Sequence, residues 1–102
     1  PKPRWKAGVG ADGNDGVATK VRETKGAIGY VELNFALEKN LPVGRVRNRE
    51  GKFVQPTLEA VTAAADAAVV LTDLPLDLRY SLVNPPGPNS YPITGTTWAV
   101  AY

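Results

Sequence analysis

The stretch GVGADGNDGVATKV, Gly8 to Val21, decides how the first part of the chain is interpreted. It contains the spacing G-x-G-x-x-G, which in dinucleotide-binding proteins follows a buried strand and opens a helix whose N-terminus receives the pyrophosphate. The preceding residues, PKPRWKA, hold two prolines and are not expected to form a central strand, because proline donates no hydrogen bond to a sheet. Glu32 lies near the expected acidic position, which is a weak match among ten acids. The glycines are therefore predicted to shape a tight loop and cap the following helix.

The amino-acid composition restricts the chemistry that the chain can perform more strictly than any motif does. The chain has 102 residues, of which 43% are hydrophobic and 22% charged, so it is one small globular domain or part of something larger. It contains no cysteine and no histidine, which excludes disulfides, thiolate zinc sites, cysteine nucleophiles and the commonest general base. Neither Ser81 nor Ser90 lies in a nucleophile elbow. We therefore expect no enzyme activity, no catalytic residue, no metal site and no cofactor.

The glycine stretch leads into a predicted short helix from Asp15 or Gly16 to Glu23. Asn14 or Asp15 is the expected cap, because short polar side chains accept hydrogen bonds from the first turn. Two valines four residues apart, Val17 and Val21, share one face that should be buried. Lys25-Gly26 ends the helix, since glycine readily adopts the left-handed conformation there.

The remaining elements alternate between helix and strand, which indicates an α/β fold. AIGYV has the character of a buried strand with something packed closely on the backbone of Gly29. Thr57 is the predicted N-cap of the clearest helix, with Glu59 in its first turn. The other predicted elements are a helix over 32–40, a hairpin over 43–54 that turns at 48–51, a strand over 79–83 and a closing strand over 93–102. Helical spacing in the helix from Thr57 links Leu58, Val61, Ala65 and Ala68, and its many alanines suggest close packing against a neighbour.

Three scattered sets of side chains have a functional and a structural interpretation. Four cations of the hairpin suit a nucleic-acid strip, but charges alternating on a hairpin are more often a solvated face that discourages edge pairing. Four aromatic rings suit base stacking, but they lie on separate elements and are expected to fill cores. Four aspartates lack the loop spacing of an EF-hand and are expected at caps and turns. These sets are, in order, Arg45, Arg47, Arg49 and Lys52; Tyr30, Phe35, Trp98 and Tyr102; and Asp12, Asp15, Asp73 and Asp77.

Four motifs occur in an order that resembles a known family. They are W-x-x-G-x-G-x-x-G-N-D-G-V-A at Trp5–Ala18, GAIGYVE at Gly26–Glu32, GKFVQPTLE at Gly51–Glu59 and YPITGTTW at Tyr91–Trp98. Together they resemble the C-terminal part of the phosphate-binding proteins of bacterial ABC transporters, and the similar DING proteins, over nearly the whole chain.

The resemblance implies a two-lobed periplasmic-binding-protein fold of type II that is incomplete in this chain. Such proteins hold one dehydrated phosphate between the lobes and dock on a membrane permease; no nucleic acid is involved. Backbone N–H groups, hydroxyls and an arginine recognise the anion. The family's phosphate ligands have no counterpart here, because the family places them ahead of the tryptophan-glycine motif. The candidates that remain in the glycine stretch are Gly13, Asn14, Asp15 and Gly16.

The family layout divides the chain into residues 1–41 as a portion of the second lobe, 42–50 as a hinge or crossing strand, and 51–102 as a portion of the first lobe. The implied function is phosphate binding and delivery to an ABC importer, this chain being a C-terminal segment that supplies scaffold and hinge. The expected location is periplasmic or extracellular, with membrane anchoring of the full-length protein left open. The expected partners are the permease subunits and the missing N-terminal portion or another copy of the chain. The alternative is a self-associating interaction module of the same fold that binds no ligand.

Overall fold

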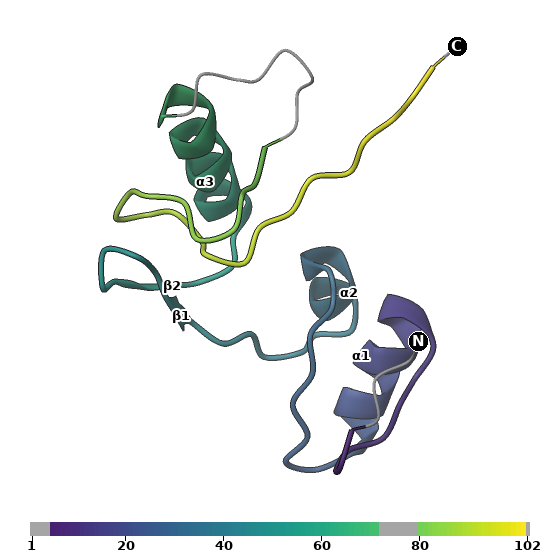
Figure 1. Ribbon diagram of the computed structural model, residues 1–102. Helices are drawn as coiled ribbons and strands as arrows, with labels where there is room; N and C mark the ends of the chain where they lie inside the picture. The colour runs from purple at the N-terminus through teal and green to yellow at the C-terminus, as the bar shows by residue number, and fades with distance from the viewer. Residues whose placement is uncertain (1–4, 72–79, 102) are drawn as a thin grey trace. The chain divides into compact units, whose positions relative to one another are not determined.

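The computed structural model describes residues 5–71 and 80–101, and its chain divides into two compact units, Pro1–Pro42 and Val43–Tyr102. The first unit contains α1 (Gly13–Glu23) and α2 (Leu33–Glu38). The second contains β1 (Val46–Arg47), β2 (Phe53–Val54) and α3 (Leu58–Leu71) (Figure 1). The described residues thus form a small mixed helix and strand segment, which agrees with the α/β prediction, while the two-lobed arrangement stays a prediction.

The glycine stretch forms the predicted loop, and α1 begins earlier than expected. Gly8 and Gly13 have φ values of +98° and +63°, a left-handed region that glycine enters without steric cost. Asp12 is the N-cap and makes no side-chain capping hydrogen bond, so the prediction of Asn14 or Asp15 as the cap was wrong. The backbone N–H of Gly16 donates to Asp12 O at 3.2 Å. The first turn of α1 therefore includes Gly13 and Gly16, although glycine has a low helix propensity.

The end of α1 follows the prediction. Thr24 is the C-cap, Gly26 has a φ of +78°, and the N–H of Ala27 donates to Thr24 O at 3.1 Å. The chain then turns back and runs alongside α1 toward α2 (Figure 1). The predicted close approach at Gly29 is confirmed, but within the described residues 27–31 pair with no neighbouring strand, so they do not form the expected sheet strand.

The helix α2 ends in a Schellman motif, in which a left-handed residue closes the last turn. Asn40 has a φ of +51°; its N–H donates to Leu37 O at 3.1 Å, and the N–H of Leu41 donates to Ala36 O at 2.8 Å. Among its apolar residues, Ala36 is buried, Leu33 is half-buried and Leu37 is exposed. The six-residue helix therefore covers less apolar surface than its sequence suggests.

The hairpin of the second unit agrees with the sequence pattern. Val46 pairs with Val54 and Arg47 with Phe53 in antiparallel register, and the N–H of Gly51 donates to Asn48 O at 3.0 Å across the turn. Gly51 has a φ of +78°, as expected for the glycine of this turn.

The helix α3 is capped as predicted, but a different face of it is buried. The N–H of Ala60 donates to Thr57 Oγ1 at 3.1 Å, which makes Thr57 the cap. The buried residues are Ala60, Ala64 and Ala68, whereas Leu58 is 74% exposed. The following loop covers the alanine face, with the N–H of Tyr91 donating to Ala60 O at 3.1 Å. The alanine face is buried, and not the face with Leu58, because small side chains let the loop approach the backbone of the helix.

The two predicted strands near the end of the chain are largely unformed in the described residues. Val83 and Ile93 make one antiparallel bridge, and the N–H of Asn84 donates to Pro92 O at 2.8 Å. The rest of 93–101 forms no ladder in the described structure. A strand acquires its hydrogen bonds only from a neighbour, so β-forming residues without one remain irregular. The predicted ends at Arg79 and Tyr102 lie outside the described residues.

Candidate functional site

The first turn of α1 contains the four candidate phosphate ligands, and internal contacts already engage three of them. Asn14 Oδ1 accepts a hydrogen bond from the backbone N–H of Glu32 at 2.9 Å, which ties the start of α1 to the N-cap of α2. Asp15 Oδ1 lies 2.8 Å from Lys39 Nζ in an ion pair. The Gly16 N–H bonds to the carbonyl of Asp12, and Gly13 is exposed.

The charges around this turn also oppose an anion. Asp12 precedes the helix and Asp15 lies in its first turn, so two carboxylates occupy the positive end of the helix dipole. The Asp15 side chain is 72% exposed, and such a surface pair contributes about 0–1 kcal/mol. Asn14 and Asp15 therefore make helix-to-helix contacts in this structure, and the N–H of Gly16 bonds within the first turn of α1.

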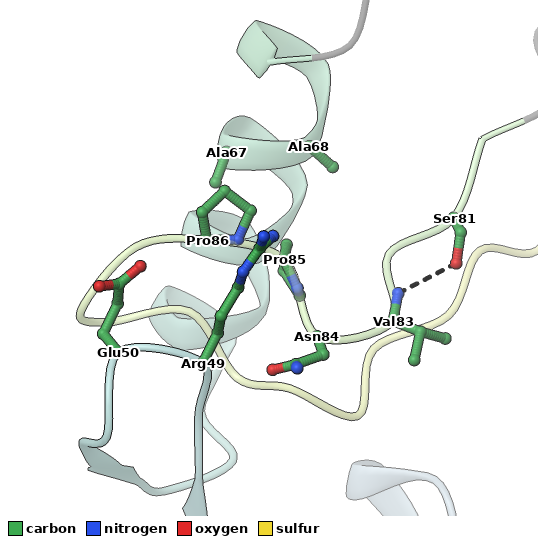
Figure 2. A pocket seen from close by; sticks show the side chains of 9 residues that line it. All are labelled: Arg49, Glu50, Ala67, Ala68, Ser81, Val83, Asn84, Pro85 and Pro86. Atoms are coloured by element: carbon green, nitrogen blue, oxygen red, sulfur yellow. Dashed lines mark hydrogen bonds between the residues drawn. The ribbon is translucent and has the colours of Figure 1, made fainter.

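An open pocket of about 500 Å³ lies in the second unit, between α3, the hairpin turn and the proline-rich loop (Figure 2). Arg49 and Glu50 both line it, so the pocket carries one cation and one carboxylate. Ser81 Oγ accepts a hydrogen bond from the backbone N–H of Val83 at 3.2 Å, as Figure 2 shows. One arginine together with one glutamate does not provide the converging donors that a dehydrated anion needs.

The polar centre of the second unit is Asn48, which the sequence suggested only as a turn residue. This side chain is 6% exposed. Its Nδ2 donates to the carbonyls of Gly87, Pro88 and Ser90 at 3.2, 3.0 and 3.2 Å. Its Oδ1 accepts from two N–H groups of the hairpin turn, at 3.1 and 3.0 Å. Asn48 therefore joins the hairpin to the proline-rich loop; its position on the same face as Val46 was the available signal.

The structural interpretation of the three sets of cations, aromatic rings and aspartates is confirmed for some residues and wrong for others. The four hairpin cations are all exposed, as expected of a solvated face. Phe35 is half-buried, but Tyr30 is 91% and Trp98 53% exposed, so the prediction that these two rings fill a core was wrong for the described chain. Trp98 contacts Tyr80 edge-on, with ring centroids 5.5 Å apart. Tyr102 lies outside the described residues.

Asp12 occupies the N-cap position of α1 without a side-chain capping bond, and Asp15 lies in the first turn of the helix, while Asp73 and Asp77 lie outside the described residues. Among residues 5–71 and 80–101, no three histidine, cysteine or acidic side chains gather where they would hold a metal ion. In the same ranges no helix has both the length and the apolar character to span a membrane.

Several relatives of the chain are named phosphate-binding protein PstS. A protein called phosphate-binding protein PstS from Xylella fastidiosa (strain Temecula1) is 39% identical over 95 residues, covering 93% of this chain and 26% of that protein. The PstS of Methanocaldococcus jannaschii is also 39% identical over 95 residues, covering 88% of this chain and 24% of the relative. The PstS of Pasteurella multocida is 34% identical over 99 residues, covering 97% and 28%.

No protein-family model matches the chain. The three relatives nevertheless match nearly all of it, each over only about a quarter of its own length. By sequence, this chain therefore matches a segment of PstS phosphate-binding proteins that is about a quarter of their length.

Proposed function

We propose that this chain is the C-terminal scaffold and hinge portion of a periplasmic phosphate-binding protein that delivers inorganic phosphate to an ABC importer. The observation that carries the proposal is the match to PstS proteins at 34% to 39% identity over 88% to 97% of the chain. The location is periplasmic or extracellular, and the partners are phosphate, bound by the complete protein, and the permease subunits. The protein performs no covalent chemistry and uses no cofactor.

Within the complete protein, residues 1–41 belong to the second lobe, 42–50 to a crossing strand at the hinge, and 51–102 to the first lobe. This assignment is supported by the division of the chain after Pro42 into two separately compact units. The contacts of Asn48 described above join the end of the proposed hinge segment to the 87–90 loop of the first-lobe portion.

The phosphate ligands lie in the part of the protein outside these 102 residues. The carboxylates of Asp12 and Asp15 at the start of α1 and the carboxylate of Glu50 in the pocket that Arg49 lines support this placement, since each sets negative charge against a bound anion. A buried phosphate site must satisfy each oxygen with a donor, because an unpaired buried charge is costly.

A chimera tests the proposal. The matched 95-residue segment of the Xylella fastidiosa PstS is replaced by the corresponding residues of this chain, and phosphate binding is measured by equilibrium dialysis with sulfate as competitor. We expect a phosphate affinity within about tenfold of the parent protein, or about 1.4 kcal/mol, because the ligands remain in the unchanged part. A chimera that melts like the parent but binds no phosphate would contradict the proposal.

A self-associating module that binds no ligand is the second candidate function. Large exposed apolar side chains in both units favour it, among them Ile28, Tyr30, Val70 and Val100 at 96%, 91%, 80% and 77% exposure, since surfaces of this kind often mark interaction sites. Sedimentation of the isolated chain tests it: a discrete oligomer that ignores phosphate supports the module, and a monomer at all concentrations rejects it.

A further inference from the structure

The segment Ala27–Val31 packs one of its sides on α1. A methyl group in place of the Gly29 hydrogen would lie 2.8 Å from Cγ2 of Val21 and 3.1 Å from Cγ1 of Val17. Ala27 and Val31, two residues to either side of Gly29, are half-buried. The odd-numbered positions of the segment therefore follow the valine face of the helix.

The even-numbered positions of the same segment carry large apolar side chains in water. Ile28 is 96% exposed and Tyr30 is 91% exposed. Alternate residues that are apolar on both sides are typical of a strand covered on two faces, as in the parallel sheets of α/β proteins. Only one of those faces is covered in the described structure.

The backbone of this segment also has unused hydrogen-bonding capacity. In the described part of the chain, the N–H of Ala27 bonds to Thr24 O, and no backbone hydrogen bond joins Ile28–Val31 to another residue. The next N–H, that of Glu32, is held by Asn14 Oδ1. The segment thus lies between two fixed ends with its strand-forming groups open to a neighbour.

We propose that Ala27–Val31 docks as a strand on a β-sheet edge supplied by the part of a PstS-type chain outside these 102 residues, burying Ile28 and Tyr30. We assign the neighbouring sheet edge to the rest of such a protein because the matched segment is only 24% to 28% of the relatives' length. About three quarters of each relative therefore lies outside the matched segment and could supply the neighbouring strand. Helices α1 and α2 on either side of the segment give the helix–strand–helix order that packs into a parallel sheet. The inference rests on the proposed function.

The test uses the chain as it stands, coexpressed with the part of the Xylella fastidiosa PstS outside the matched segment. Affinity capture through a tag on this chain, followed by amide hydrogen exchange, reports docking. We expect capture of the complementary polypeptide and exchange slowed at least about tenfold at residues 28–31, because a sheet protects the amides that it pairs. Failure of capture, or capture with these amides unprotected, overturns the inference.

Two matched substitutions separate docking from folding. Ile28→Asp places a charge at the proposed contact and is expected to weaken capture at least about tenfold. Val9→Asp, the control, introduces the same charge at a residue of the same unit that is 77% exposed and lies outside the segment, and capture should be unchanged. Circular dichroism of each isolated variant should match the parent, because neither side chain is buried. Equal effects of both substitutions overturn the inference.

Two further outcomes distinguish this inference from its alternatives. A dimer of the isolated chain in which residues 28–31 are protected assigns the surface to a second copy and overturns the proposal. Phosphate binding by the coexpressed complex is measured separately: binding without protected amides refutes the docking site alone, whereas protected amides without binding refute the proposed function alone.

Discussion

Replacing Asn48 by alanine should strongly destabilise the second unit. The side chain is 6% exposed, donates through Nδ2 to three carbonyls of the 87–90 loop and accepts through Oδ1 from the N–H groups of Glu50 and Lys52. Its two amide protons and two accepted bonds amount to four independent hydrogen bonds, since one proton is shared between carbonyls.

The magnitude follows from the net value of such bonds. At about 0.5–1.5 kcal/mol each, four bonds contribute about 2–6 kcal/mol. Water can reach the exposed Pro88 in the variant, which favours the lower half of that range. We therefore expect Asn48→Ala to lower the free energy of unfolding by about 2–4 kcal/mol.

Urea denaturation followed by circular dichroism measures this loss, and amide exchange at Glu50 and Lys52 reports it locally. Asn89→Ala, in the same loop but exposed, is the control and should change stability by less than about 0.5 kcal/mol. Equal stability of the Asn48→Ala variant and the parent would show that these hydrogen bonds contribute no net stability.

Asn48→Asp tests the direction of the donors. The substitution keeps one acceptor but turns the donating end into an oxygen that faces three carbonyls. The pKa of the new carboxyl should therefore rise above the ordinary aspartate value of about 3.9. Its destabilising effect should be smallest below about pH 4 and grow as the pH rises through the folded-state pKa. A loss of stability independent of pH would contradict this assignment of the donors.

Three further predictions concern the helices. Gly29→Ala should destabilise the first unit by about 1–3 kcal/mol, because its new methyl group would lie 2.8 Å from Cγ2 of Val21; thermal melts check this against Gly44→Ala, where nothing lies within 4 Å, and equal melts would contradict it. Thr57→Ala should cost about 1 kcal/mol through loss of the α3 cap, whereas Thr57→Ser should retain most of it; equal losses in urea titrations would reject the capping role. Hydrogen bonds from its own backbone and from the Thr57 hydroxyl hold the pKa of Glu59 below its ordinary value of 4.5. Its stabilising contribution should therefore be complete above pH 4.5 and disappear as the pH falls through the folded-state pKa; melts of Glu59→Gln with the same acid dependence as the parent would disprove this.

Local backbone features were predictable because they depend on residues close in sequence. The left-handed glycine after α1, the hairpin turn at Gly51 and the Thr57 cap each need a specific residue at a specific place. Features that depend on a distant partner were less accessible. Which face of α3 is buried depends on the loop that ends at Tyr91. The hydrogen bonds of Asn48 form only because that loop returns to the hairpin.

The candidate site illustrates the same difference. The sequence predicted that the glycine stretch is a loop and not a nucleotide site, because the prolines before it prevent a preceding strand. It did not predict that Asn14 and Asp15 would be engaged by Glu32 and Lys39, since those contacts depend on how α1 packs on α2. The exposed Ile28 and Tyr30 could not be predicted either, because a strand pattern implies burial and does not identify the neighbour that provides it.

Titration of the isolated 102-residue chain with inorganic phosphate by isothermal calorimetry tests most directly whether the anion-binding groups lie elsewhere in the protein. We expect no saturable heat up to about 1 mM phosphate, which corresponds to a binding free energy weaker than about −4 kcal/mol. Saturable binding with a micromolar Kd by the monomeric chain would contradict it.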